Sequence, residues 1–208
     1  MRRWIGWLFL LAGLLLVSYP LLKKIAFDRQ QQQLLATFEK LGEMGQADLA
    51  METEIALPSP EKNAADNSQN TMLDGARGML EIPKIDLGMI IFERVSETEL
   101  AKGAGMIEPQ KEFAQHNVGL AGHRSVAKGQ QFNRLGELRE GDEITVETAG
   151  ETLRYKVTDT FIVHQSEIGV LDDAETPLLT LVTCTPLGKR HPPNRLIVQA
   201  ELQDVAEH

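Results

Sequence analysis

The sequence contains a single cysteine, Cys184, among its 208 residues. Without a second cysteine the chain has no CxxC pair, and it also has no HExxH motif. Its five histidines are scattered along the chain, so the sequence gives little support for a structural or catalytic zinc site. We therefore expect no metal and no cofactor.

An excess of positive charge is also missing. The formal net charge is -9, although four basic residues crowd the N-terminal segment. The rest of the chain is thus more acidic still, and we expect no nucleic-acid partner. A content of 42% hydrophobic and 25% charged residues suits one ordinary globular domain with attachments.

Charge is absent from Trp4 to Leu22. A helix of that length would extend about 28 Å, close to the thickness of the hydrocarbon core of a bilayer. No small-x-small cleavage site precedes Lys23 and Lys24, which favours an uncleaved anchor over residues 1–26. Arg2 and Arg3, with the terminal amine, favour a cytoplasmic N-terminus. We expect a single-pass protein of the cell membrane with most of the chain outside the cell.

Two further regions follow the predicted anchor. Residues 27–72 are predicted to form a stalk and linker, because Leu34, Phe38 and Leu41 have helical spacing and residues 58–70 lack any apolar periodicity. Residues 73–208 are predicted to form the main folded domain. Its pattern is of short strands separated by turn residues, with brief helices over 97–101 and 132–138. The predicted strands are 79–82, 89–92, 118–122, 143–148, 153–163, 178–184 and 195–202.

This pattern indicates a mainly β domain, either a closed barrel or a sandwich. Three polar or reactive side chains lie at predicted strand ends. Cys184 ends a β-branched strand, because Pro186 cannot donate to a ladder. Arg195 begins the next strand, so antiparallel pairing would bring it close to Cys184. His123 ends a strand of small residues, where another backbone or a substrate could approach closely.

Thiol, imidazole and guanidinium together suit acyl transfer: sulfur attacks a carbonyl, histidine protonates the leaving amine, and arginine stabilises the oxyanion. A buried cysteine without a chemical role is the alternative. His191 lies between Cys184 and Arg195 in the sequence and is the rival base, but His123 is favoured by its place at a strand end.

These residues with their flanking sequences resemble the signature of the sortases, the surface transpeptidases of Gram-positive bacteria. The resemblance rests on Ala-Gly-His123-Arg, Thr-Leu-Val-Thr-Cys184 and Asn-Arg195-Leu-Ile-Val, in that order. It implies a closed eight-stranded β-barrel with short helices. It also implies that Cys184, His123 and Arg195 are catalytic and that Thr183 lines the substrate groove.

The implied reaction cleaves an LPXTG-like sorting signal between Thr and Gly, forms a thioester on Cys184, and transfers the protein to an amine acceptor such as a peptidoglycan precursor. The expected partners are surface proteins that carry this signal. The loops 165–176 and 185–194 are the expected walls of the groove. A pilin-polymerising sortase, a hydrolytic cysteine peptidase and an anchored binding module are the alternatives.

The subclass is less determined by the sequence. Ser125 stands where many sortases have an aspartate, and no Asp-Pro-aromatic lid motif precedes the barrel, whereas Thr-Cys184-Thr-Pro resembles the pilin branch. The expectation leans toward anchoring of proteins to the cell wall.

Overall fold

The computed structural model describes residues 73–125, 131–189 and 191–207. The predicted membrane anchor over 1–26 and the predicted stalk over 27–72 lie outside these ranges. Within them, no helix has the length and apolar character needed to cross a bilayer.

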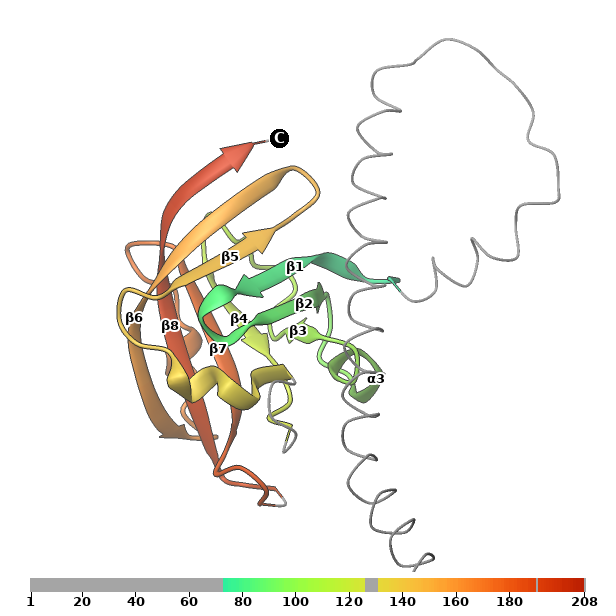
Figure 1. Ribbon diagram of the computed structural model, residues 1–208, viewed down its shortest axis with the longest axis vertical. Helices are drawn as coiled ribbons and strands as arrows, with labels where there is room; N and C mark the ends of the chain where they lie inside the picture. The colour runs from blue at the N-terminus through green and yellow to red at the C-terminus, as the bar shows by residue number, and fades with distance from the viewer. Residues whose placement is uncertain (1–72, 126–130, 190, 208) are drawn as a thin grey trace, which may run out of the picture.

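Eight strands form a closed barrel in the order β1-β2-β3-β4-β7-β8-β6-β5 (Figure 1). The predicted mainly β class and closed eight-stranded barrel are therefore confirmed. The strands are β1 Ala76–Ile82, β2 Leu87–Phe92, β3 Ala104–Met106, β4 Asn117–Ala121, β5 Glu143–Glu147, β6 Glu151–His164, β7 Leu178–Thr185 and β8 Asn194–Glu207. Four short helical segments connect them: η1 Pro83–Ile85, α3 Glu97–Leu100, η2 Gln131–Glu137 and η3 Ile168–Leu171.

Alternation of apolar side chains fills the barrel. In the hairpin of β5 and β6, Ile144 pairs with Tyr155 and Val146 with Leu153, and all four side chains lie in the core. Strands with a period of two bury one face in this way. Burial raises the pKa of Tyr155, and its hydroxyl donates to the carbonyl of Phe113 at 2.8 Å.

The sequence reading missed one strand, β3. This strand has only three residues and shows no alternation, because Ala104, Gly105 and Met106 are all buried. It is held as a strand by backbone pairing with β2, which runs parallel to it, and with β4, which runs antiparallel. A Cβ at Gly105 would collide with the carbonyl of Arg94, so glycine is needed for this close approach. No local pattern could predict a strand defined by two distant neighbours.

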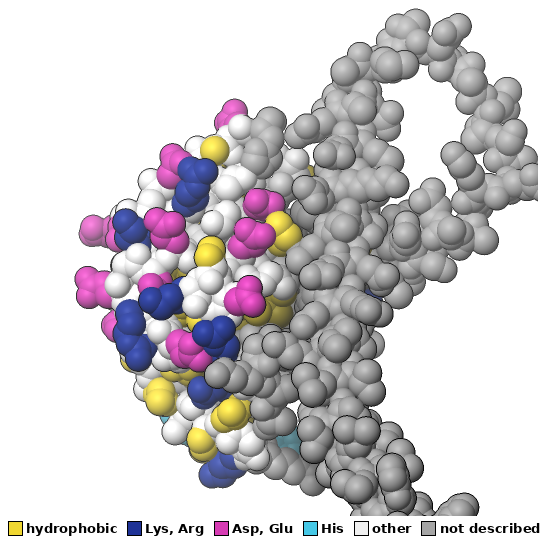
Figure 2. Space-filling view, in the orientation of Figure 1, with side chains coloured by type: hydrophobic (Ala, Val, Ile, Leu, Met, Phe, Trp, Pro, Cys, Tyr) yellow, Lys and Arg dark blue, Asp and Glu magenta, His cyan; other side chains and the backbone are white. Residues whose placement is uncertain are grey.

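Acidic and basic side chains alternate over the face of the barrel that Figure 2 shows, without a large area of one sign. The strands that matter for function are β4, β7 and β8, which are neighbours in the barrel. β4 and β7 run parallel, whereas β7 and β8 run antiparallel. As a result, the C-terminal ends of β4 and β7 lie beside the start of β8.

Candidate active site

Cys184 and Arg195 are direct partners in the β7–β8 ladder. The antiparallel pairing expected from the sequence is thus present, and its register places Cys184 directly opposite Arg195. Opposed residues of an antiparallel pair project from the same face, with Cβ atoms about 5 Å apart. The thiol and the guanidinium therefore leave the sheet side by side, and both residues are half-buried.

His123 lies two residues beyond the last β4–β7 pair, Ala121 with Val182. Cys184 is also two residues beyond that pair, on the parallel neighbour. The amide of Gly122 donates to the carbonyl of Val182 at 3.1 Å, so the backbone after β4 stays beside β7. His123 and Cys184 therefore lie at the same end of the β4–β7 pair.

The three side chains belong to the outer face of the barrel. Leu179 and Leu181 of β7 are in the core, so the alternating positions Val182 and Cys184 face outward. On β4 Val118 and Leu120 are in the core, so Ala121 faces outward, and the same alternation continued past the end of the strand gives His123 the outward side. Ala121 and Val182 are partly buried and form an apolar floor directly before the three polar groups.

Hydrogen bonds hold the guanidinium of Arg195. One terminal nitrogen, Nη1, donates to the carbonyls of Pro192 at 2.8 Å and Asn194 at 3.0 Å. The other, Nη2, donates to Oε1 of Gln165 at 3.1 Å. These bonds use three of the five N–H groups of an arginine. Among the described residues the other two have no acceptor, and they are free for a substrate.

His123 is open to solvent, with 43% of its side chain exposed, and its Nε2 lies 3.8 Å from Oε2 of Glu97. Glu97 opens helix α3, which is capped by the Ser96 hydroxyl accepting from the amide of Glu99. The Glu97 side chain is 95% exposed, so this contact is weak. The rival base, His191, is exposed in the segment between β7 and β8.

Thr183 is only 2% exposed. Its hydroxyl donates to the carbonyl of Gly122 at 2.7 Å, so in the structure it ties β7 to the residue before His123. A contact between Thr183 and substrate remains a prediction.

The small residues of β4 accommodate side chains of the protein itself, which differs from the expectation of a neighbouring backbone or substrate. A Cβ on Gly119 would collide with Leu171 of η3, and one on Gly122 would collide with the ring of Phe132. Leu171, the last residue of η3, packs over the sheet at Gly119. The segment after β6, a predicted groove wall, thus covers the outer face up to the apolar floor.

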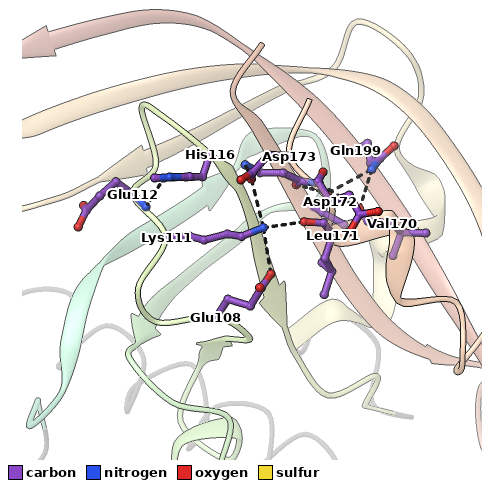
Figure 3. A network of polar contacts seen from close by, with 11 residues as sticks. Glu108, Lys111, Glu112, His116, Val170, Leu171, Asp172, Asp173 and Gln199 are labelled. Atoms are coloured by element: carbon purple, nitrogen blue, oxygen red, sulfur yellow. Dashed lines mark hydrogen bonds and ion pairs between the residues drawn. The ribbon is translucent and has the colours of Figure 1, made fainter. Parts of the chain in front are cut away.

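Lys111 fixes this covering segment in place (Figure 3). Its ammonium donates to the carbonyl of Leu171 at 2.7 Å and lies 3.1 Å from both Glu108 and Asp173. The side chain of Lys111 is 12% exposed. One buried cation therefore links the segment before β4 to the segment before β7.

Asn117 reinforces this link from within β4. Its amide nitrogen Nδ2 donates to the carbonyls of Val170 and Asp172, both at 3.0 Å. Gln199 of β8 also donates to Val170, at 3.1 Å (Figure 3). The sequence analysis missed Lys111 and Asn117; a polar residue at the start of an otherwise small and apolar strand was the only signal.

Ionisation strengthens the link at neutral pH. The backbone N–H of Asn117, and then Lys111, hold the pKa of Asp173 below its ordinary value of 3.8. For Lys111, burial opposes the charge, but the bonds to Glu108 and Asp173 outweigh it and raise the pKa. A lowered carboxyl pKa stabilises the fold fully above pH 3.8, and this contribution is lost as the pH falls through the folded-state value.

Lys111→Met should lower the melting temperature by a few degrees, about 3–6 °C, because the Leu171 carbonyl and two carboxylates lose their cation. Thermal unfolding followed by circular dichroism at pH 7 measures this. Lys156→Met, at an exposed position of β6, is the matched control and should leave the melting temperature within about 1 °C. Equal melting temperatures for the two variants would show that Lys111 does not hold the segment.

The chain resembles known proteins both in sequence and in structure. A family model described as a sortase domain matches residues 80–203. Sortase A of Listeria monocytogenes is 24% identical, over 88% of this chain and 84% of its own length. Its solved structure superposes with a TM-score of 0.62 over 65% of this chain and 92% of that chain, at 23% identity. Sortase C2 of Group B Streptococcus pilus island 1 is 28% identical, with a TM-score of 0.57 over 62% of this chain and 75% of that chain.

Proposed function

This chain belongs to the sortase family, whose members are transpeptidases, and from that membership we propose that it is a cysteine transpeptidase acting through Cys184. The observation that carries the proposal is the register of the three outward-facing groups. Cys184 is paired with Arg195 across β7 and β8, and His123 stands at the matching position past the end of β4.

In the first step the thiolate of Cys184 attacks the carbonyl carbon of the threonine in a Thr-Gly bond. The free N–H groups of Arg195 stabilise the oxyanion that develops there. His123 gives its proton to the glycine nitrogen as the C–N bond breaks. The products are a thioester on Cys184 and a peptide with a free amine.

In the second step an acceptor amine attacks the thioester carbonyl. His123 takes the proton of the attacking amine, and the C–S bond breaks to release the thiolate. A new amide joins the threonine to the acceptor, and both catalytic groups return to their starting state. The open side of His123, which is 43% exposed, leaves access for the acceptor.

The substrate we propose is an LPXTG-like sorting signal of a surface protein. The apolar floor of Ala121 and Val182 suits a Leu-Pro pair, and the segment held by Lys111 bounds it. A peptidoglycan precursor is the proposed acceptor, with a pilin lysine as the alternative. Residues 1–26 would anchor the protein in the cell membrane, 27–72 would form a stalk, and 73–208 would act outside the cell.

Mass spectrometry tests this proposal. The full-length chain in detergent is mixed with a Leu-Pro-x-Thr-Gly peptide, with and without a glycine-based amine. We expect a thioester on Cys184 and a ligated product that needs the amine. Cleavage that is indifferent to the amine would indicate a hydrolytic peptidase. The absence of both adduct and cleavage across a library of sorting motifs would contradict the transpeptidase and favour a binding module.

A further inference from the structure

The backbone ladder between β4 and β7 ends just before the candidate catalytic pair. Its last registered pair is Ala121 with Val182, followed by the bond from the Gly122 amide to Val182. If the parallel ladder continued, the amide of Cys184 would donate next to the Gly122 carbonyl. The hydroxyl of Thr183 donates to that carbonyl at 2.7 Å. At this point a side-chain hydrogen bond from Thr183 reaches the carbonyl that a backbone amide would reach in a continued ladder.

A second contact of the same kind follows Cys184. Nη1 of Arg124 donates to the hydroxyl oxygen of Thr185 at 2.9 Å. The two threonines flank Cys184, and their partners, Gly122 and Arg124, flank His123. Two hydrogen bonds thus join β7 to the segment after β4, one on each side of the Cys184 and His123 positions.

Burial makes the second contact effective. Thr185 is 7% exposed, and Nε of Arg124 is buried without a partner among the described residues. A charge-assisted hydrogen bond in such surroundings is stronger than one in water. Arg124 is not a solvated cation; its guanidinium is committed to the end of β7.

The rest of the chain around His123 is also held. The amide of Phe132 donates to the carbonyl of His123 at 3.1 Å, and Phe132 is fully buried. Nδ2 of Asn133 donates to the carbonyl of Ser125 at 2.5 Å. These bonds fix His123 to η2. Among the described residues, the two threonine contacts extend the link to the strand of Cys184 beyond the Gly122–Val182 bond.

We propose that the Arg124–Thr185 hydrogen bond is a positioning device that, with the Thr183 contact, sets His123 against Cys184. Arg124 and Thr185 touch no reacting atom in this role. They act through the separation of thiol and imidazole, on which proton transfer to the leaving amine depends. A misplacement of about 1 Å at a reacting pair costs on the order of a hundredfold in rate. This inference rests on the proposed transpeptidase function.

The test compares Thr185→Val with Thr185→Ser in the full-length chain. Valine keeps the shape of threonine but cannot accept from Arg124, whereas serine keeps the acceptor oxygen. We expect Thr185→Val to lower kcat for peptide transfer about ten- to a hundredfold, with KM within twofold. Thr185→Ser should restore kcat to within about threefold of the native chain.

Thr160→Val is the matched control, because the hydroxyl of Thr160 on β6 is buried without a partner among the described residues. The same chemical change there removes no hydrogen bond and should leave kcat unchanged. A kcat of Thr185→Val within twofold of the native value would overturn the proposal. Equal losses in the valine and serine variants, or a loss that follows the melting temperature, would overturn it as well.

A readout without substrate separates this inference from the proposed function. Amide hydrogen exchange over residues 122–125 should become faster in Thr185→Val and stay native in Thr185→Ser. If the native chain shows no transfer activity, the proposed transpeptidase function is wrong. Hydrogen exchange alone then decides whether the Arg124–Thr185 contact holds the segment after β4 against β7. Unchanged exchange in Thr185→Val would refute the positioning device whatever the activity.

Discussion

Cys184→Ala should abolish thioester formation and lower the rate of peptide transfer by at least about a thousandfold. The substitution removes the only thiol of the chain, and no other nucleophile occupies the matching position beside Arg195. Because Cys184 is half-buried at a strand end, alanine there leaves a small void, and the fold should persist. Intact-mass spectrometry with the sorting peptide measures the loss directly.

Two controls separate loss of chemistry from loss of structure. Peptide binding followed by fluorescence anisotropy should stay within a fewfold of the native protein in Cys184→Ala, since Ala121 and Val182, the proposed contacts of the Leu-Pro pair, are unchanged. Alkylation of the native protein modifies only Cys184, because there is no second cysteine, and should also stop transfer. Turnover that survives either treatment would exclude a cysteine mechanism.

Arg195→Lys should lower kcat for peptide transfer by about a hundred- to a thousandfold, the usual cost of losing an oxyanion donor. Lysine keeps the charge but not the planar fork. It cannot bind the Pro192 and Asn194 carbonyls and Gln165 and also present two N–H groups to a substrate. Steady-state kinetics with the sorting peptide and a saturating amine measures the effect.

Arg154→Lys is the matched control for this change. Arg154 pairs with Asp204 at 2.9 Å on the exposed surface of β6 and β8, where lysine can keep the ion pair. The kcat of the Arg154→Lys variant should stay within twofold of the native value. If Arg195→Lys shows the same small effect, the guanidinium is not the oxyanion donor, and its role is limited to holding the ends of β6 and β8 together.

Local patterns predicted much of the barrel correctly. The strands β5 and β6 were predicted over 143–148 and 153–163, and the strand ending near Cys184 followed from its β-branched run and the proline after it. β3 was missed because three buried residues carry no period. The expected closeness of Cys184 and Arg195 was correct because the end of one strand lies beside the start of the next when consecutive strands pair antiparallel. The exact register, which makes the two residues direct partners, comes from the structure.

The contacts that surround the site were beyond sequence reasoning. Lys111 and Asp173 are far apart in the chain, and each reads as an ordinary surface charge until the segment before β7 packs over the sheet. The same holds for Arg124 and Thr185. Their hydrogen bond depends on the parallel register of β4 and β7, which two strands separated by 56 residues do not reveal in their own sequences.

The sequence by itself determined which chemistry is available: one thiol, a histidine and an arginine at strand ends, in a mainly β domain, within a signature that resembles the sortases. Residue type and local periodicity are properties of the sequence itself, so these features can be predicted without a structure. Only the tertiary structure decided which side of the barrel they share, which carbonyls hold Arg195, and which side chains tie His123 to Cys184. Those contacts join segments distant in sequence, and their geometry exists only after the barrel has closed.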